Sequence, residues 1–113
     1  MTLPTDNETW VIEAGDRIIQ KKARRGRASL SPWEKLVYCL WVADYGMRNA
    51  GDLDTAGDVY PDFRSEAKRL AKQLRLRLTH EAFSLSKSDL EREYLARFES
   101  ICDEIRNAEP GTE

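Results

Sequence analysis

Residues 31–51 read SPWEKLVYCLWVADYGMRNAG and contain the strongest helix signal in the sequence. Ser31 is a typical N-cap, Pro32 suits the first helical position, and Glu34 completes a capping box with the serine. Gly51 is a typical helix stop. Apolar side chains cover one face of this helix and much of the other, which predicts a central helix surrounded by its neighbours. The first face holds Trp33, Leu36, Val37, Leu40, Trp41 and Met47, and the other holds Tyr38, Val42 and Tyr45.

Three more amphipathic segments surround this central helix in the sequence. Capping-box patterns beginning at Thr5 and at Ser88 mark the start of two of them, and Gly26 is placed to end the first. The spacing of apolar residues predicts helices at about 6–25, 61–78 and 89–107, besides the central one at 32–49.

The segments between the helices have the composition of connectors. Residues 51–62 are rich in glycine and aspartate and predict turns with a short helical turn inside, and residues 79–87 predict a second connector. No segment alternates apolar and polar residues as a strand does. We therefore expect an all-α fold, a compact bundle of about four helices in a single domain, 1–113, with a frayed C-terminal tail.

Composition predicts a packed, water-soluble domain. The 113 residues are 41% apolar and 34% charged, and the longest apolar run, Leu36 to Ala43, is far shorter than the ~20 residues that span a bilayer. The acidic N-terminal stretch lacks the basic and hydrophobic parts of a secretory signal, so we expect a cytoplasmic protein. Cys39 and Cys102 form no C-x-x-C pair and are expected to be reduced, partly buried thiols.

Asp44 is an unusual residue because it falls within the apolar arc of the central helix. A carboxylate without a partner would be costly there. Arg48 lies one turn further along the same face, so we expect an Asp44–Arg48 ion pair. The pair has two interpretations, a structural contact that fixes helix packing, which we favour, and a polar group in a pocket.

An acidic loop follows the central helix. Its aspartates partly match a calcium-binding loop, but position five is Ala56 and position twelve, which needs a glutamate, is Phe63. We therefore expect an ordinary acidic loop without a metal, and we treat it as a candidate surface for binding a partner. Its four carboxylates belong to Asp52, Asp54, Asp58 and Asp62.

Two basic surfaces are expected on the first and third helices. Residues 64–80 hold six basic residues and one acidic residue, whereas residues 81–113 hold four basic and nine acidic residues. Without an interleaved aromatic platform, such surfaces predict salt-sensitive, non-specific contacts to nucleic acid, or simply solvated faces. The first surface comprises Lys21, Lys22, Arg24, Arg25 and Arg27, and the second Arg64, Lys68, Lys72 and Arg75.

Signals for catalysis are weak. His80 is the only histidine, which excludes a multi-histidine metal site, and no nucleophile elbow, P-loop or dinucleotide fingerprint is present. We expect neither an enzyme nor a bound cofactor.

The stretch Pro32-Trp-Glu-Lys-Leu-Val-Tyr-Cys-Leu-Trp-Val-Ala-Asp-Tyr-Gly-Met-Arg-Asn-Ala-Gly51 resembles the signature region of a bacterial helical family that includes a DNA-mimic protein. Members of that family carry an aromatic-rich helix ending in Asn-Gly-Gly-Phe. The corresponding residues here are Asn49-Ala50-Gly51-Asp52, which keep the first and third positions. The resemblance implies a non-enzymatic protein that binds another protein through an acidic surface, as a DNA mimic or an immunity-type antagonist.

Together these patterns favour a bacterial-type helical module that binds another protein stoichiometrically through a charged surface, as a regulator or antagonist. The alternative is a nucleic-acid-associated protein that uses the two basic surfaces. Leu76, placed on the outward face of the third helix, predicts some apolar surface for a partner, and a homodimer stays open.

Overall fold

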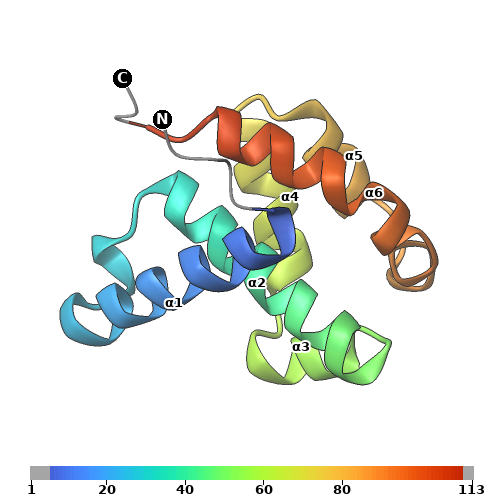
Figure 1. Cartoon of the computed structure of the whole chain (residues 1–113), viewed down its shortest axis with the longest axis horizontal. Coiled ribbons are helices and arrows are strands. Elements are labelled where there is room, and N and C mark those ends of the chain that lie inside the picture. The colour runs from blue at the N-terminus through green and yellow to red at the C-terminus, as the bar shows by residue number, and fades with distance from the viewer. Residues whose placement is uncertain (1–5, 111–113) are drawn as a thin grey trace.

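The computed structural model describes residues 6–110 and is helical throughout its regular structure (Figure 1). No strand occurs within this range, so the all-α prediction is confirmed, but the prediction of about four helices is wrong. Residues 6–110 form six α-helices and one short 3₁₀ helix, η1. They are α1 (Asn7–Arg25), η1 (Arg27–Ser29), α2 (Pro32–Ala50), α3 (Asp54–Val59), α4 (Phe63–Gln73), α5 (Arg77–Phe83) and α6 (Lys87–Asn107).

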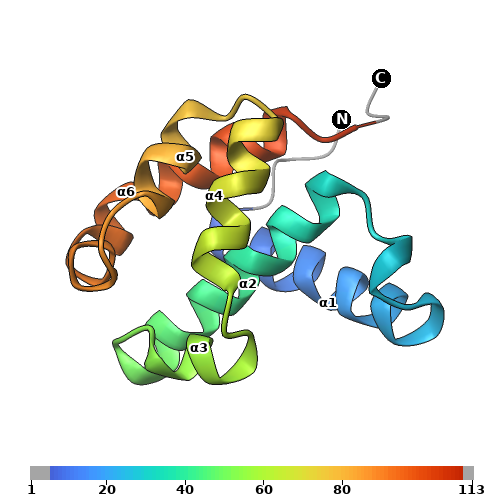
Figure 2. The same ribbon diagram turned by 180° about the vertical axis from the view of Figure 1, so that it is seen from behind.

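Helix α2 is central, as its sequence predicts. It contacts α1, α3, α4 and α6, with α1 in front of it in Figure 1 and α4 in front of it in the reverse view of Figure 2. Both halves of the predicted capping box are formed: Glu34 N donates to Ser31 Oγ at 3.1 Å, and Ser31 N donates to Glu34 Oε1 at 2.8 Å. Gly51 ends the helix in the left-handed conformation, with φ at 76°.

The predicted helix over residues 61–78 is instead two helices, because α4 ends in a Schellman motif. The amide of Leu76 donates to Ala71 O at 2.8 Å and the amide of Arg75 donates to Lys72 O at 3.1 Å, which is the hydrogen-bond pattern of that motif. Arg75 occupies the left-handed position, with φ at 61°, where glycine is usual. The sequence has no glycine at this position and therefore does not predict the break.

Helix α5 fills much of the segment predicted as a connector over 79–87. Its first turn is held by Glu104 of α6, whose carboxylate accepts hydrogen bonds from the amides of Leu78 and Thr79 at 2.9 and 2.8 Å. The prediction that Leu76 faces outward is also wrong. The chain changes direction at Arg75, and Leu76 is buried, with 6% of its surface exposed. The chain therefore forms two packed helices, α4 and α5, where a single helix over 61–78 was expected.

Two predicted helix starts are corrected as well. Asp6 caps α1 by accepting from Thr9 N at 2.9 Å, while Thr5 lies outside the described residues. Ser86 rather than Ser88 caps α6, which begins two residues earlier than predicted. The short helix α3 confirms the helical turn expected within residues 51–62.

Packing around α2 is asymmetric. Trp33, Leu36 and Leu40 are buried in the core, but Tyr45 is 42% exposed, and Tyr38 and Trp41 are only half-buried. The prediction that α2 is nearly surrounded is therefore wrong for one strip of its surface. Within residues 6–110, no helix combines the length and the hydropathy that crossing a membrane requires.

Candidate binding surface

The uncovered strip of α2 carries an aromatic stripe, which we define as Tyr38, Trp41 and Tyr45. These side chains share one face of the helix because they are three and four residues apart. Their rings are stacked: the centroids of Tyr38 and Trp41 are 6.2 Å apart with planes 10° apart, and those of Trp41 and Tyr45 are 5.5 Å apart with planes 16° apart. The result is a row of nearly parallel rings, partly open to solvent.

Helix α1 borders one side of the stripe. A Cβ atom built on Gly15 would lie 2.2 Å from Cδ1 of Trp41, so the indole packs directly against the α1 backbone. Lys22 lies over the Tyr38 ring at 5.0 Å, and Glu8 lies 3.7 Å from Arg48, so α1 and α2 run antiparallel. This register places the exposed side chain of Ile12 at the level of Tyr45.

Helix α3 and the residues after it border the other side. Gly46 allows this approach, because a Cβ there would lie 3.0 Å from the backbone of Asp52 and of Ala56. Tyr60 follows α3, and its ring centroid lies 5.8 Å from that of Tyr38. Next to it, Val59 is 45% exposed. The stripe is thus flanked by further apolar surface on both sides.

Cations gather at the Tyr38 end of the stripe. The guanidinium of Arg27 lies 5.0 Å from the centre of the Tyr60 ring, donates to the Tyr60 hydroxyl, and lies 3.3 Å from Glu66. Burial raises the pKa of Tyr60, and the Glu66 carboxylate adds to that shift, so the phenol stays protonated. Lys22, Arg27, Tyr38, Val59 and Tyr60 together line a hollow of about 80 Å³.

The predicted Asp44–Arg48 ion pair is present, in the core and not in a pocket. Asp44 is 4% exposed and accepts hydrogen bonds from Arg48 Nε at 3.0 Å and from the Tyr94 hydroxyl at 2.7 Å. Burial raises the pKa of Tyr94 well above its ordinary value, and the neighbouring Asp44 carboxylate adds to the shift. The sequence pattern does not predict Tyr94 as a partner of Asp44, although a tyrosine on the apolar face of α6 needs an acceptor for its hydroxyl.

The four aspartates of the acidic loop lie on and around α3, and they differ in their contacts. Asp52 caps the next turn by accepting from Asp54 N at 3.0 Å, and Asp54 pairs with Lys87 at 2.6 Å. Asp58 and Asp62 are exposed. Phe63, the residue at position twelve of the calcium-loop pattern, is buried in the core. Within the described residues, no group of three histidine, cysteine, aspartate or glutamate side chains is placed to hold a metal ion.

Four carboxylates of α6 accept hydrogen bonds from other elements of the fold. Glu91 accepts from Leu53 N at 2.8 Å, Glu104 holds the first turn of α5, and Glu99 and Asp103 both accept from the Asn7 side chain. Glu91 and Glu104 are half-buried, whereas Glu99 and Asp103 remain exposed.

The structure does not bring the two basic surfaces together, because α1 and α4 lie on opposite sides of α2 (Figures 1 and 2). On α1, Lys21 pairs with Glu34 at 3.0 Å, while Arg24 and Arg25 are exposed and make no hydrogen bond or ion pair within residues 6–110. The four side chains of the second basic surface also make no hydrogen bond or ion pair within that range; Lys68, Lys72 and Arg75 are exposed, and Arg64 is half-buried.

The remaining residues with chemically reactive side chains are Cys39, Cys102 and His80. Cys39 and Cys102 are free and buried, as expected for structural thiols. Burial raises the pKa of Cys39 to about 12 and raises that of Cys102 as well, so neither forms the reactive thiolate at neutral pH. His80 is half-buried beside Leu76 and Arg75.

Comparison of the chain with protein-family models, with curated proteins and with solved structures finds no significant match. The resemblance of residues 32–51 to the DNA-mimic family therefore stays a prediction. The class that the structure itself defines is an all-α protein whose central helix presents a row of partly exposed aromatic rings.

Proposed function

We propose that this protein is a non-enzymatic binding module that associates stoichiometrically with another protein, as a regulator or antagonist, through the aromatic stripe of α2. The observation that carries the proposal is the row of stacked, half-exposed rings of Tyr38, Trp41 and Tyr45. Tyrosine, tryptophan and arginine dominate the energetic centres of protein interfaces. In this chain two tyrosines and a tryptophan lie in one line along α2, and Arg27 lies near one end of that line.

The stripe is suited to binding because it is rigid before a partner arrives. Trp41 is held against Gly15, and Lys22 packs on the Tyr38 ring, so these side chains lose little conformational freedom on association. Ile12 and Val59 extend the apolar area on either side. The partner that fits is a protein with an apolar segment over the rings and an acidic group near Lys22.

The acidic loop takes the role of a polar rim in this proposal. Asp58 and Asp62 are exposed and lie beside Val59 and Tyr60 in the chain. Rim charges contribute little affinity but influence association rate and choice of partner. This assigns the charged surface expected from the sequence a secondary part, and the aromatic residues the main one.

Site-specific photocrosslinking in the source cells tests the proposal. A photoreactive phenylalanine analogue at Tyr45 should give one defined protein adduct, whereas the same analogue at Leu95, which is 63% exposed on α6, should not. With the purified partner, Tyr45→Ala should raise Kd by about tenfold or more, and Leu95→Ala by less than about twofold. Equal adducts from both positions, or equal affinity of Tyr45→Ala and the unsubstituted chain, would contradict the proposal.

The alternative function is nucleic-acid binding, and one observation favours it. Stacked rings beside Lys22 and Arg27 form the kind of platform on which bases of a single strand stack. Fluorescence anisotropy of labelled single-stranded RNA and DNA distinguishes the two functions. Binding that weakens by orders of magnitude between about 50 and 200 mM salt, and that is lost in Tyr45→Ala, would support the alternative, whereas no binding favours a protein partner.

A further inference from the structure

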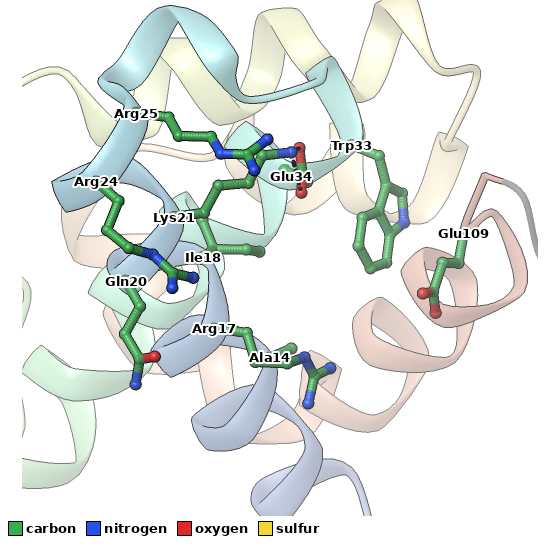
Figure 3. A pocket seen from close by; sticks show the side chains of 10 residues that line it. All are labelled: Ala14, Arg17, Ile18, Gln20, Lys21, Arg24, Arg25, Trp33, Glu34 and Glu109. Atoms are coloured by element: carbon green, nitrogen blue, oxygen red, sulfur yellow. Dashed lines mark hydrogen bonds and ion pairs between the residues drawn. The ribbon is translucent and has the colours of Figure 1, made fainter.

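A second hollow lies on another face of α1 than the face that packs against the aromatic stripe of α2. It has a volume of about 460 Å³ and lies between the second half of α1, the start of α2 and Glu109, which follows α6 (Figure 3). A volume of this size is within the range of small-molecule sites. The proposed protein-binding function does not involve this hollow, so the inference stands independently of that function.

Four basic side chains from α1 line this hollow, and only one of them is neutralised. Lys21 forms an ion pair with Glu34 at 3.0 Å. Arg17, Arg24 and Arg25 make no hydrogen bond or ion pair within residues 6–110. Basic side chains at this spacing repel one another, and the dipole at the C-terminal end of α1 offsets only part of that repulsion. An anion bound between these basic side chains would offset the remaining repulsion.

The polar groups on the opposite wall of the hollow, which come from α2, already have hydrogen-bond partners. The Trp33 indole donates its N–H to Ile105 O at 2.8 Å, and the Glu34 carboxylate is engaged by Lys21 and by the Ser31 amide. Ala14 and Ile18 add apolar surface at the base of the hollow. The polar groups left to bind a ligand are the Gln20 amide and the guanidinium groups of the three arginines, which Figure 3 shows around the hollow together with Trp33 and Glu34.

We infer that this hollow binds a small ligand that carries two or more phosphate groups. Guanidinium groups bind phosphate through paired N–H donors, in a geometry that lysine does not offer. Arg17 and Arg24 are seven residues apart on α1, which separates their backbone positions by roughly 10 Å. Three guanidinium groups without a partner carry more positive charge than one phosphate neutralises, whereas a chain of phosphates can pair with each of them. Glu109 at the rim disfavours anions that extend beyond the hollow.

Titration of the full chain with inorganic triphosphate, followed by calorimetry and by amide NMR, tests the inference. Triphosphate should bind more tightly than orthophosphate and should shift the amide signals of Lys21 to Arg25 and the indole N–H signal of Trp33. The double variant Arg17→Gln/Arg24→Gln should weaken triphosphate binding by about tenfold or more, since it removes charge-assisted hydrogen bonds. Both side chains are exposed, so the variant should fold normally.

The matched control is Lys68→Gln/Lys72→Gln on α4, which removes the same charge from exposed positions on the other basic surface. It should change the Kd for triphosphate by less than about twofold, since α4 lies on the other side of α2 from α1 and salt screens exposed charges there. Equal weakening in both double variants would show attraction by overall charge and would overturn the inference. So would the absence of triphosphate binding at millimolar concentration, or binding of a short DNA strand in preference to triphosphate.

Discussion

At the scale of single residues, Asp44 supports more of the core than its size suggests. Its carboxylate accepts from both Tyr94 and Arg48, and no buried side-chain nitrogen or oxygen in the described part of the chain lacks a partner. Asp44→Ala leaves the Tyr94 hydroxyl buried without an acceptor and should lower the free energy of unfolding by about 2–4 kcal/mol. Urea denaturation measures this, with the exposed Asp16→Ala expected to change it by less than about 0.5 kcal/mol. Equal losses would mean that the Asp44 contacts do not stabilise the fold.

Gly15 gives a second prediction at this scale, because it determines where Trp41 lies. Gly15→Ala places a Cβ atom within the volume of the indole, so the ring must move, at a cost of about 1–3 kcal/mol. The near-ultraviolet circular dichroism of the stacked rings should change with it. Gly57→Ala is the control, since no atom lies within 4 Å of its added Cβ and alanine favours helix. If Gly15→Ala leaves both stability and the spectrum unchanged, the close packing is wrong.

At the scale of elements, the break between α4 and α5 depends on one residue in an unfavourable backbone conformation. Arg75 has φ at 61°, a region that costs a residue with a Cβ roughly 1–2 kcal/mol and glycine almost nothing. Arg75→Gly should therefore raise the free energy of unfolding by about 1 kcal/mol, as measured by thermal and urea denaturation. Arg75→Ala removes the same charge but keeps the Cβ, so it should give no such gain. A gain in both variants would instead implicate charge repulsion along α4.

At the scale of the whole molecule, the sequence predicts local features better than it predicts their assembly. The capping box at Ser31 and Glu34 was identified correctly because all its atoms come from one helical turn. The start of α5 was missed because its cap, Glu104, comes from another helix, 25 residues away along the chain. The aromatic stripe was missed for a similar reason. Its three residues were noted on α2, but their exposure depends on how far α1 and α3 cover the helix.

Burial of two thiols and a phenol gives the whole fold a predictable response to high pH. The pKa of Cys39 is raised from 9.0 to about 12, so the folded chain holds a proton that the unfolded chain loses. Stability from this group is fully present below pH 9.0 and is lost as the pH rises toward the folded value. Cys102 and Tyr94 act in the same direction. The free energy of unfolding should therefore fall by about 1.4 kcal/mol per pH unit above 9 for each buried thiol.

Urea denaturation between pH 7 and 10.5 in the presence of a reductant measures this dependence. Cys39→Ala should lower stability at neutral pH, because it leaves a small cavity, yet it should flatten the decline above pH 9. Cys102→Ala should flatten it in the same way, since both thiols are fully buried, one on α2 and one on α6. Parallel pH profiles for the variants and the unsubstituted chain would show that the thiols ionise without unfolding the protein, and hence that water reaches them in the native state.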